Sequence, residues 1–312
     1  MAFPLPRSCF EGPVLKILVT GANGHLGLRL IVQLAGQHDV VAAVRSESAL
    51  AKVGGLKCSA HVVDYKDSSA LTVVADGCHC VVHLVGIIKS SENNSYEQAH
   101  ELPCEALVAA AQKAGINHIV ALSIIGSGAQ STNDCFASRG RAEEILLAGD
   151  VPVTILRVPM VLGENDFASR ALHKKASSNV AFTFRHLSLE QPIYAGDVVD
   201  AIQAALEQFK PSNPGEHSGI LELAGPESVT RRELIARAGQ IFGNSPAIVS
   251  LPVFMGVYLG RLCELFLSSP PITGDMIDLL DHDDDIDSLE IASILGINLT
   301  SLDNTLRKVL VD

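Results

Sequence analysis

The sequence predicts an α/β fold built on a doubly wound parallel sheet, with a small C-terminal lobe on the substrate side. In the first half of the chain, short apolar runs alternate with longer segments of helical period. These runs are nearly unbroken Val, Ile and Leu, which is typical of parallel strands covered by helices on both faces. The chain has 312 residues, 47% of them hydrophobic, so it is long enough to bury a large core.

Six apolar runs have the length and composition of strands: residues 15–20, 40–44, 60–63, 80–85, 119–123 and 154–157. The most regular helical segments between them are 96–114 and 134–148, and Gly115 and Gly149 follow these segments as expected stops. After Arg157 the alternation weakens. A polar stretch at 165–178 precedes a further helical segment at 195–209.

Composition and charge exclude several partner classes. The formal charge of -12 and the lack of a basic run argue against a nucleic-acid partner. The most apolar late segment, 251–267, contains Arg261 and Glu264 and is shorter than the roughly 20 residues of a bilayer span. We therefore expect no transmembrane segment, and we interpret 251–267 as a packed or surface helix. The first twelve residues lack the charged and apolar regions of a secretory signal.

The cysteines and acidic residues do not predict a metal site. Seven cysteines without paired spacing indicate thiols in a reducing compartment, so we expect a cytoplasmic protein. Cys78-His79-Cys80 has no second ligand pair at a useful distance for zinc. The acidic run 281–285 lacks the glycine and the spaced ligands of a calcium loop, which favours a solvated loop. We predict no metal.

A glycine-rich turn between the first strand and the helix that follows is the strongest functional signal. Residues 20–27 read Thr-Gly-Ala-Asn-Gly-His-Leu-Gly. Small residues at this spacing allow a tight turn, close approach of a pyrophosphate and close helix packing, and the helix N-terminus offers free amides to the phosphates. Glycines also occur in such turns for backbone reasons alone. We assign the phosphate site to Gly21, Asn23, Gly24, His25, Leu26 and Gly27.

The end of the second strand bears on the choice of dinucleotide. An acidic residue there would bind the 2'-hydroxyl of NAD, but the chain has Arg45. A guanidinium can pair bidentately with a 2'-phosphate, so NADP(H) is favoured and NAD(H) stays an alternative. An exposed Arg at a strand end is also common without a ligand.

Two further positions are assigned to the cofactor from their place after strands. Asp64, which follows the third strand, is expected to accept a hydrogen bond from the adenine amino group, or else to cap a helix. Leu84, Val85 and Gly86, at the end of the fourth strand, are expected to run beneath the cofactor, or else to serve packing alone.

These observations divide the chain into three parts. Residues 1–13 form a loose leader, and 14–158 form a dinucleotide-binding core. Residues 159–312 return elements to this core and form the small substrate-side lobe.

Longer segments carry a family resemblance. They are TGANGHLG at 20–27, VVHLVGI at 81–87, HIVALSIIGS at 118–127, TILRVPMVLGEND at 154–166, QPIYAGDVVDAI at 191–202 and LELAGPESVT at 221–230. On these segments the chain resembles the atypical and extended short-chain dehydrogenase/reductases, including relatives like the NADPH-binding accessory subunit of respiratory complex I and the NAD-dependent epimerase/dehydratases. The resemblance implies a Rossmann-like core, and it places Pro159 beside the cofactor.

The same resemblance identifies the catalytic positions and a departure at two of them. Active members use a Tyr as proton donor, a Lys four residues later and a Ser or Thr on the fifth strand. Ser123 fits the hydroxyl position, but Cys135 stands where the Tyr belongs and Arg139 where the Lys belongs. Arg139 can hold ribose hydroxyls but cannot relay protons.

Two function classes follow. The first is an NADP(H)-dependent oxidoreductase that acts on a small carbonyl, sugar or quinone-like substrate, with Tyr96, His100 and Tyr194 as other candidate acids. The second is a non-catalytic NADPH-binding structural or redox-sensing subunit, which the missing Tyr/Lys pair supports. The sequence favours the oxidoreductase slightly. A homodimer or a partner protein is compatible with both classes.

Overall fold

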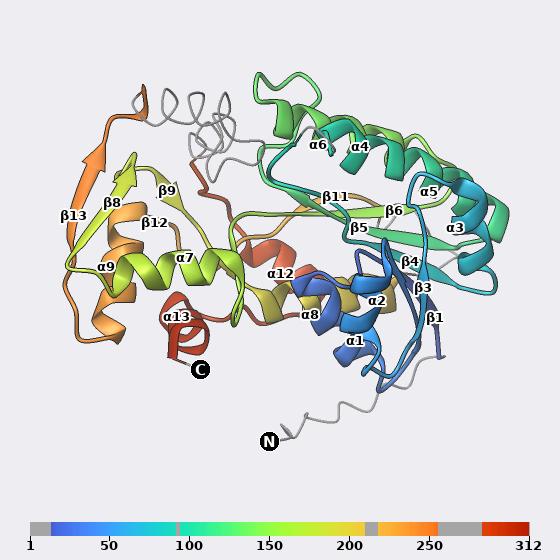
Figure 1. The fold of residues 1–312 in the computed structure, drawn as a ribbon, viewed down its shortest axis with the longest axis horizontal. Helices are drawn as coiled ribbons and strands as arrows, with labels where there is room; N and C mark the ends of the chain where they lie inside the picture. Colours follow the sequence, from blue (N-terminus) through green and yellow to red (C-terminus); the bar gives the residue numbers. More distant parts are fainter. Residues whose placement is uncertain (1–13, 92–93, 210–217, 255–282, 312) are drawn as a thin grey trace.

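A parallel sheet runs through the larger part of the molecule. The computed structural model describes residues 14–91, 94–209, 218–254 and 283–311. Seven parallel strands are ordered β11-β6-β5-β4-β1-β2-β3 (Figure 1). They are β1 (Lys16–Thr20), β2 (Asp39–Val44), β3 (Ser59–Val62), β4 (Cys80–His83), β5 (His118–Ile124), β6 (Val153–Val158) and β11 (Gly219–Glu222). The strand order reverses between β1 and β4, and in such sheets ligands bind at that point, outside the carboxyl ends of the strands.

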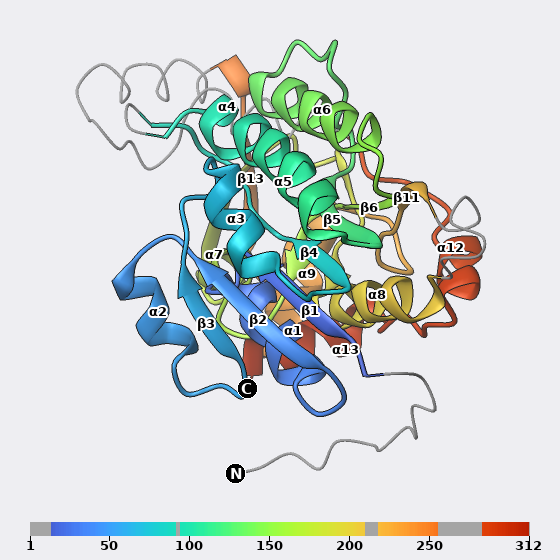
Figure 2. The same ribbon diagram turned by 90° about the vertical axis from the view of Figure 1, so that its right-hand side faces the viewer.

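Helices cover both faces of the sheet, as the apolar runs require (Figure 2). One face carries α1 (His25–Leu34), α2 (Glu47–Val53), α8 (Ala195–Gln208) and α12 (Leu289–Leu295). The other carries α3 (Ser68–Ala75), α5 (Glu101–Ala114) and α6 (Asp134–Leu147), with the short α4 (Tyr96–Ala99) against α5 and α6. The doubly wound parallel α/β fold predicted from the sequence is therefore confirmed.

A smaller lobe lies to one side of this core, next to the end of β6 and the start of α1 (Figure 1). Its helices are α7 (Phe167–Ala176), α9 (Arg231–Ile241) and α13 (Leu302–Val311). They pack around a separate cluster that includes Leu172, Leu234 and Leu306. Three strand pairs complete the lobe: β7 (Val161–Leu162) with β10 (Ile193–Tyr194), β9 (Leu189–Glu190) with β12 (Val229–Thr230), and β8 (Val180–Phe184) with β13 (Ala247–Leu251).

The structure differs from the sequence-based elements in several places. The helix predicted at 96–114 is two helices that meet at His100. Pro103 explains this break, because it has no N–H to donate to the carbonyl of Ala99, four residues earlier. The polar stretch 165–178 contains α7, whose first turn is capped by the Asp166 side chain. The strand β11 was not predicted.

Some predictions fall outside the described residues. They concern the leader 1–13, the part of 251–267 that follows Phe254, and Asp281 with His282. In the described ranges, no helix has the length and apolar character to cross a membrane.

Candidate dinucleotide site

The glycine-rich turn joins β1 to α1 at the point where the strand order reverses. Gly21 has a φ of +74°, which favours glycine. Its N–H donates to Tyr65 Oη at 2.9 Å, and the Tyr65 hydroxyl donates to Ala43 O at 2.6 Å. The Gly24 N–H donates to Gly21 O at 3.0 Å. The turn is thus fixed both internally and to the end of β2.

Gly27 and Gly24, the other two glycines in this turn, have different surroundings. A Cβ on Gly27 would lie 2.6 Å from Gly21 O and 2.7 Å from Ala22 O, so a side chain there would push α1 away from the turn. Gly24 is exposed, and a Cβ on it would meet only Gly21 O, at 3.1 Å. Gly27 therefore serves helix packing, whereas Gly24 keeps the outer surface of the turn open.

The first turn of α1 has the features of an anion site. Gly24 is its N-cap residue and supplies no side-chain hydrogen bond, and there is no acidic residue in the first turn. The neighbouring helices α2 and α3 are instead capped by Ser46 and Asp67. Free amides at a helix N-terminus attract phosphate. The half-buried Asn23, His25 and Leu26, all assigned to the cofactor from the sequence, belong to this turn.

The adenosine side of the site would lie beyond the end of β2. Arg45 is exposed immediately after β2, close enough to Tyr65 for its charge to act on that phenol. Burial raises the pKa of Tyr65, and the Gly21 hydrogen bond and Arg45 oppose the rise. Asp64 is exposed and its Oδ1 accepts from Lys66 N at 3.1 Å. The alternative role of Asp64 as a helix cap is wrong, because Asp67 caps α3.

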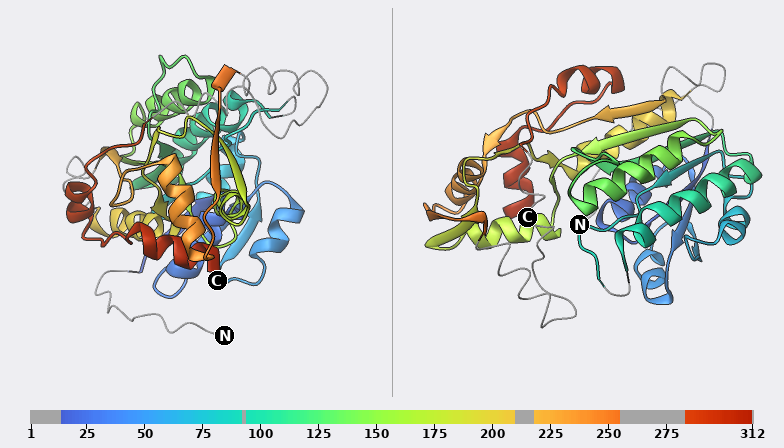
Figure 3. Two further views of the ribbon diagram at one scale, coloured as in Figure 1. Left: turned by 90° about the vertical axis from the view of Figure 1, so that its left-hand side faces the viewer. Right: turned by 90° about the horizontal axis from the view of Figure 1, so that it is seen from above.

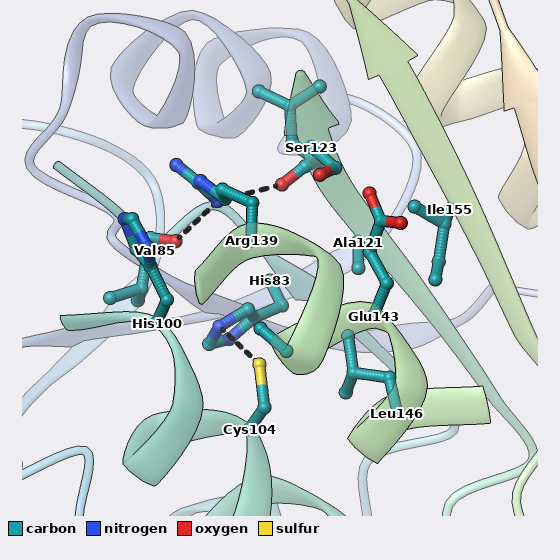
Figure 4. A pocket seen from close by; sticks show the side chains of 12 residues that line it. His83, Val85, His100, Cys104, Ala121, Ser123, Arg139, Glu143, Leu146 and Ile155 are labelled. Atoms are coloured by element: carbon teal, nitrogen blue, oxygen red, sulfur yellow. Dashed lines mark hydrogen bonds between the residues drawn. The ribbon is translucent and has the colours of Figure 1, made fainter. Parts of the chain in front are cut away.

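Arg139 reaches from α6 to the ends of β4 and β5 (Figure 4). Its Nη1 donates to Val85 O and to Leu122 O, both at 3.3 Å. A Cβ on Gly86 would overlap the Arg139 guanidinium, so glycine is required for this contact. Leu84 is half-buried, Val85 buried and Gly86 exposed. Arg139 therefore lies over the segment that the sequence predicts beneath the cofactor.

The Arg139 charge is held in a cavity whose lining also includes His83, His100 and the Glu143 carboxylate, which pairs with Arg157. Burial lowers the pKa of Arg139, and no described residue accepts a hydrogen bond from its Nε. Burial, together with the Arg139 charge, lowers the pKa of His83 to about 3 and that of His100 to about 3. His83 Nδ1 lies 2.8 Å from Thr20 Oγ1, and His100 Nε2 lies 3.0 Å from Ile87 O. A buried guanidinium with an unsatisfied N–H fits a hydrogen-bond acceptor such as a ribose hydroxyl.

The structure brings Ser123 and Arg139 to one small cavity but leaves Cys135 out of its lining. Ser123 is buried at the end of β5, with its Oγ 3.3 Å from Ser127 Oγ. Cys135 is fully buried in the first turn of α6, and its thiol donates to Ile87 O at 3.8 Å. Pro159 is half-buried directly after β6. Ser123 and Arg139 thus share the cavity, whereas Cys135 lies outside its lining but near enough to Arg139 to interact with its charge.

The other candidate acids are engaged elsewhere. Tyr96 is buried and donates to Ile88 O at 3.1 Å. Tyr194 donates to Glu164 Oε1 at 2.6 Å, and the Lys308 ammonium lies 4.3 Å from the centre of its ring. Burial and the Glu164 hydrogen bond raise the pKa of Tyr194 to about 12, which makes it a poor proton donor.

Sequence reasoning missed two contributors to this region. Tyr65 ties the turn to β2, and the only signal was a Tyr next to the predicted Asp64. Glu164 links the start of α1 to the smaller lobe: its carbonyl lies 2.7 Å from His25 Nε2, and its carboxylate pairs with Arg29 and Tyr194. Glu164 stands in the GEND sequence after the sixth strand, where an acid had no assigned role.

No metal centre is formed by the described residues. Nowhere in them do three His, Cys, Asp or Glu side chains gather as ligands. Cys78 and Cys80 are buried thiols, and burial raises the pKa of Cys80 to about 12. Between them, His79 accepts from Lys16 N through Nδ1 at 2.9 Å. In the acidic run, Asp283 and Asp285 are exposed, whereas Asp284 is half-buried.

Comparisons with known proteins agree with this geometry. The mitochondrial NADH dehydrogenase (ubiquinone) 1 alpha subcomplex subunit 9 of Arabidopsis thaliana is 28% identical over 259 residues, covering 79% of this chain and 62% of that subunit. The chain therefore spans less than two thirds of the plant subunit. Ceramide reductase of Caulobacter vibrioides is 24% identical over 241 residues, 76% of this chain and 73% of the reductase.

A solved structure shares the fold. The Bordetella bronchiseptica enzyme WbmG, in complex with NAD and UDP, superimposes with a TM-score of 0.73 at 18% identity, over 96% of this chain and 94% of WbmG. The sequence family described as NAD(P)H-binding matches residues 21–185, which is more than half of the chain. With its Rossmann-like sheet and glycine turn, the chain belongs to the NAD(P)H-binding family.

Proposed function

We propose that this protein binds NADP(H) and holds it as a ligand, without the proton relay of a tyrosine-lysine pair. The observation that carries this proposal is the position of Cys135. Its side chain is 0% exposed and its thiol points to Ile87 O. A proton donor must come within hydrogen-bond reach of the substrate, and a thiol enclosed by protein does not meet that requirement.

The residues present fit the dinucleotide. The amides of the first α1 turn would hold the pyrophosphate, and the free surface of Gly24 leaves room for it. Arg139, with its unsatisfied Nε, would hold the nicotinamide ribose. Bound NADPH supplies a hydride donor at this site. Held without turnover, it would serve as a structural ligand or a redox signal.

Arg45 supports a preference for the phosphorylated dinucleotide. It is exposed at the carboxyl end of β2, next to the phenol that fixes the turn. A guanidinium there can make two charge-assisted hydrogen bonds to a 2'-phosphate, which NAD(H) lacks. We therefore infer that NADP(H) binds more tightly than NAD(H).

Fluorescence titration with NADPH and NADH tests this preference. Wild type should bind NADPH about tenfold or more tightly than NADH, because one charge-assisted pair contributes roughly 1.5–3 kcal/mol. Arg45→Ala should remove this difference and leave the NADH affinity unchanged. Arg170→Ala, which alters another exposed Arg in α7, is the matched control and should retain the preference. Equal affinities for the two nucleotides in wild type would contradict the role of Arg45.

An oxidoreductase is the second candidate, and Ser123 favours it. This hydroxyl lines the Arg139 cavity, at the position where short-chain dehydrogenases place a Ser or Thr. One of the similar proteins is a ceramide reductase. The assay follows NADPH oxidation with aldehydes, ketones and quinones, in wild type, Cys135→Ser and Ser123→Ala at equal folded concentration.

The held-ligand proposal expects tight NADPH binding and no turnover in any of the three proteins. Turnover that falls about a hundredfold in Ser123→Ala, the typical size of a general acid–base contribution, would favour the oxidoreductase. Turnover that is lost only in Cys135→Ser would make the thiol the acid and refute the proposal.

A further inference from the structure

The hydroxyl of Tyr65 lies where neighbouring strands of the core separate. Strands β1, β2 and β3, drawn in shades of blue in Figure 3, are adjacent at one side of the sheet. The ladder between β1 and β2 ends with Thr20 opposite Ala43, and the chain then turns away at Gly21. Tyr65, three residues after β3, extends its side chain to this point. It thereby connects the ends of two strands from a position beyond the third.

Two hydrogen bonds fix this hydroxyl between the turn and β2. Its oxygen accepts from the Gly21 N–H at 2.9 Å, and it donates its own proton to Ala43 O at 2.6 Å. Burial raises the pKa of Tyr65 above its usual value of 10.0, so the phenol keeps the proton that it donates. The hydroxyl therefore continues the hydrogen bonding of the sheet past the end of the ladder between β1 and β2.

The opposite side of Gly21 is closed by the end of β4. A Cβ on Gly21 would lie 3.0 Å from both the carbonyl carbon and the carbonyl oxygen of Leu84. Gly21 is thus held between the Leu84 backbone and the Tyr65 hydroxyl. An N–H that loses its acceptor in such a half-buried place costs free energy, so without this hydroxyl the turn would shift toward another acceptor.

We propose that Tyr65 is a positioning residue for the dinucleotide, and that its hydroxyl holds the turn 21–27 in the conformation that binds the pyrophosphate. The Gly21 N–H is bound to Tyr65 and the Gly24 N–H to Gly21 O, which leaves the first amides of α1 for the phosphates. The turn is ordered before the ligand arrives, so binding does not have to order it. The proposal rests on the proposed function only for the assignment of this turn to the pyrophosphate, and not for the preference between NADP(H) and NAD(H).

Packing of the ring is the other role open to Tyr65, and it predicts a different result. Tyr65 is 3% exposed and belongs to the core cluster that includes Leu71 and Leu107. Phe would fill the same space and keep this packing. If the ring alone mattered, Tyr65→Phe would bind dinucleotides as wild type does.

Calorimetric titration of Tyr65→Phe with three ligands tests the proposal. We expect NADPH and NADH both to bind about tenfold more weakly than to wild type, because a turn that adopts the binding conformation for about a tenth of the time lowers affinity by that factor. The ratio of the two affinities should not change, since Arg45 is intact. Adenosine 2'-monophosphate has no pyrophosphate and should bind this variant as it binds wild type.

Thr154→Val is the matched control. Thr154 is 1% exposed, and its Oγ1 lies 2.9 Å from His118 Nε2 at the amino ends of β5 and β6, whereas the turn lies at the carboxyl ends of the strands. This variant also loses a buried hydrogen bond, and it should bind all three ligands with wild-type affinity. Urea unfolding in parallel gives the folded fraction of both variants.

Hydrogen exchange of the Gly21 amide in the unsubstituted protein provides a measurement that does not depend on a variant. Without ligand, this amide should exchange at least about a hundredfold more slowly than in an unstructured peptide. A Gly21 amide without such protection, normal NADPH affinity in Tyr65→Phe, or an equal loss of adenosine 2'-monophosphate binding overturns the proposal.

The same titrations separate this proposal from the proposed function. Equal affinities of wild type for NADPH and NADH, with a tenfold loss of both in Tyr65→Phe, would refute the role of Arg45 and support that of Tyr65. A wild-type protein that binds neither dinucleotide would refute the proposed function and this proposal together.

Discussion

Gly24 and Gly27, three residues apart in the same turn, are constrained by different neighbours. A Cβ on Gly27 meets backbone oxygens at 2.6 and 2.7 Å, and neither can move without opening the turn. We expect Gly27→Ala to lower the free energy of unfolding by about 1–3 kcal/mol, as overpacking does elsewhere. Gly24→Val should leave most of that free energy intact and abolish dinucleotide binding, because its side chain would occupy the space for the pyrophosphate. Urea unfolding and NADPH fluorescence measure the two effects.

Gly36→Ala is the control for this pair, because nothing lies within 4 Å of a Cβ at Gly36. It should change neither unfolding nor binding appreciably. A folded Gly24→Val protein with normal NADPH affinity would show that the dinucleotide does not approach this turn.

Single residues were predictable from the sequence where a local pattern defines them. The glycine spacing in 21–27 is such a pattern, and the structure forms the expected turn there. Tyr65 and Glu164 could not be found in this way. Their partners, Gly21 and Arg29, lie 44 and 135 residues away in sequence, so only the folded chain brings them together. Cys135 was placed correctly on its helix, but its burial against Ile87 O depends on the packing of α6.

At the scale of elements, one buried ion pair joins α6 to the sheet. Glu143 on α6 is 4% exposed, and its carboxylate binds Arg157 of β6 at 2.5 Å; Arg157 also reaches Glu222 of β11 at 3.1 Å. Arg157→Met would leave the Glu143 carboxylate buried without a partner. We expect a loss of about 3–5 kcal/mol in the free energy of unfolding, and recovery of most of it in Arg157→Met/Glu143→Leu. Urea unfolding measures both values.

Arg237→Met provides the comparison, because Arg237 pairs with Glu233 and Glu227 at the surface of the lobe. Its loss should cost no more than about 1 kcal/mol, as is usual for exposed pairs. If the two single variants are equally stable, the Glu143–Arg157 pair is not the buried link that its geometry indicates.

Strands and helices were predictable from the sequence where their own residues form a clear pattern, and not where they depend on pairing with distant residues. Five of the six predicted core strands are mostly apolar, because both faces of a parallel sheet are covered, whereas the edge strand β3 reads Ser-Ala-His-Val and is largely exposed. The seventh, β11, has only four residues, Gly-Ile-Leu-Glu, and its place beside β6 depends on a long-range pairing. The break at His100 was predictable in principle from Pro103, but a continuous helical period concealed it.

At the scale of the whole molecule, hydrogen bonds and ion pairs of individual residues connect the core to the smaller lobe. Glu164 binds α1 of the core and Tyr194 of the lobe, and Lys308 of α13 covers the ring of that Tyr. The dinucleotide turn therefore touches a network that ends in the last helix of the chain. Residues 283–288 make a second connection, since Ser288 Oγ accepts from Ala224 N at 2.8 Å, beside β11.

The segment 283–288 should also make stability depend on pH, through Asp284. Its N–H donates to Leu189 O at 3.2 Å, and Ser228 Oγ donates to its carbonyl at 2.7 Å, so the residue is fixed against the lobe. Burial, followed by the neighbouring Glu190 carboxylate, raises the pKa of Asp284 from 3.8 to about 7; Arg231 opposes the rise and Asp283 adds to it.

The sign of this dependence follows from proton binding. Between pH of about 4 and about 7, the folded protein keeps a proton on Asp284 that the unfolded chain has released, so the contribution of this residue to stability falls as pH rises through that window. Asp284→Asn cannot ionise. We expect the free energy of unfolding of this variant, relative to wild type, to be larger at pH of about 8 than at pH of about 5. Urea unfolding at each pH measures this difference. Asp285→Asn, which removes the carboxylate of an exposed neighbour, is the matched control. A constant difference between Asp284→Asn and wild type would mean that Asp284 ionises alike in the folded and unfolded chains, and that its burial beside Glu190 carries no cost.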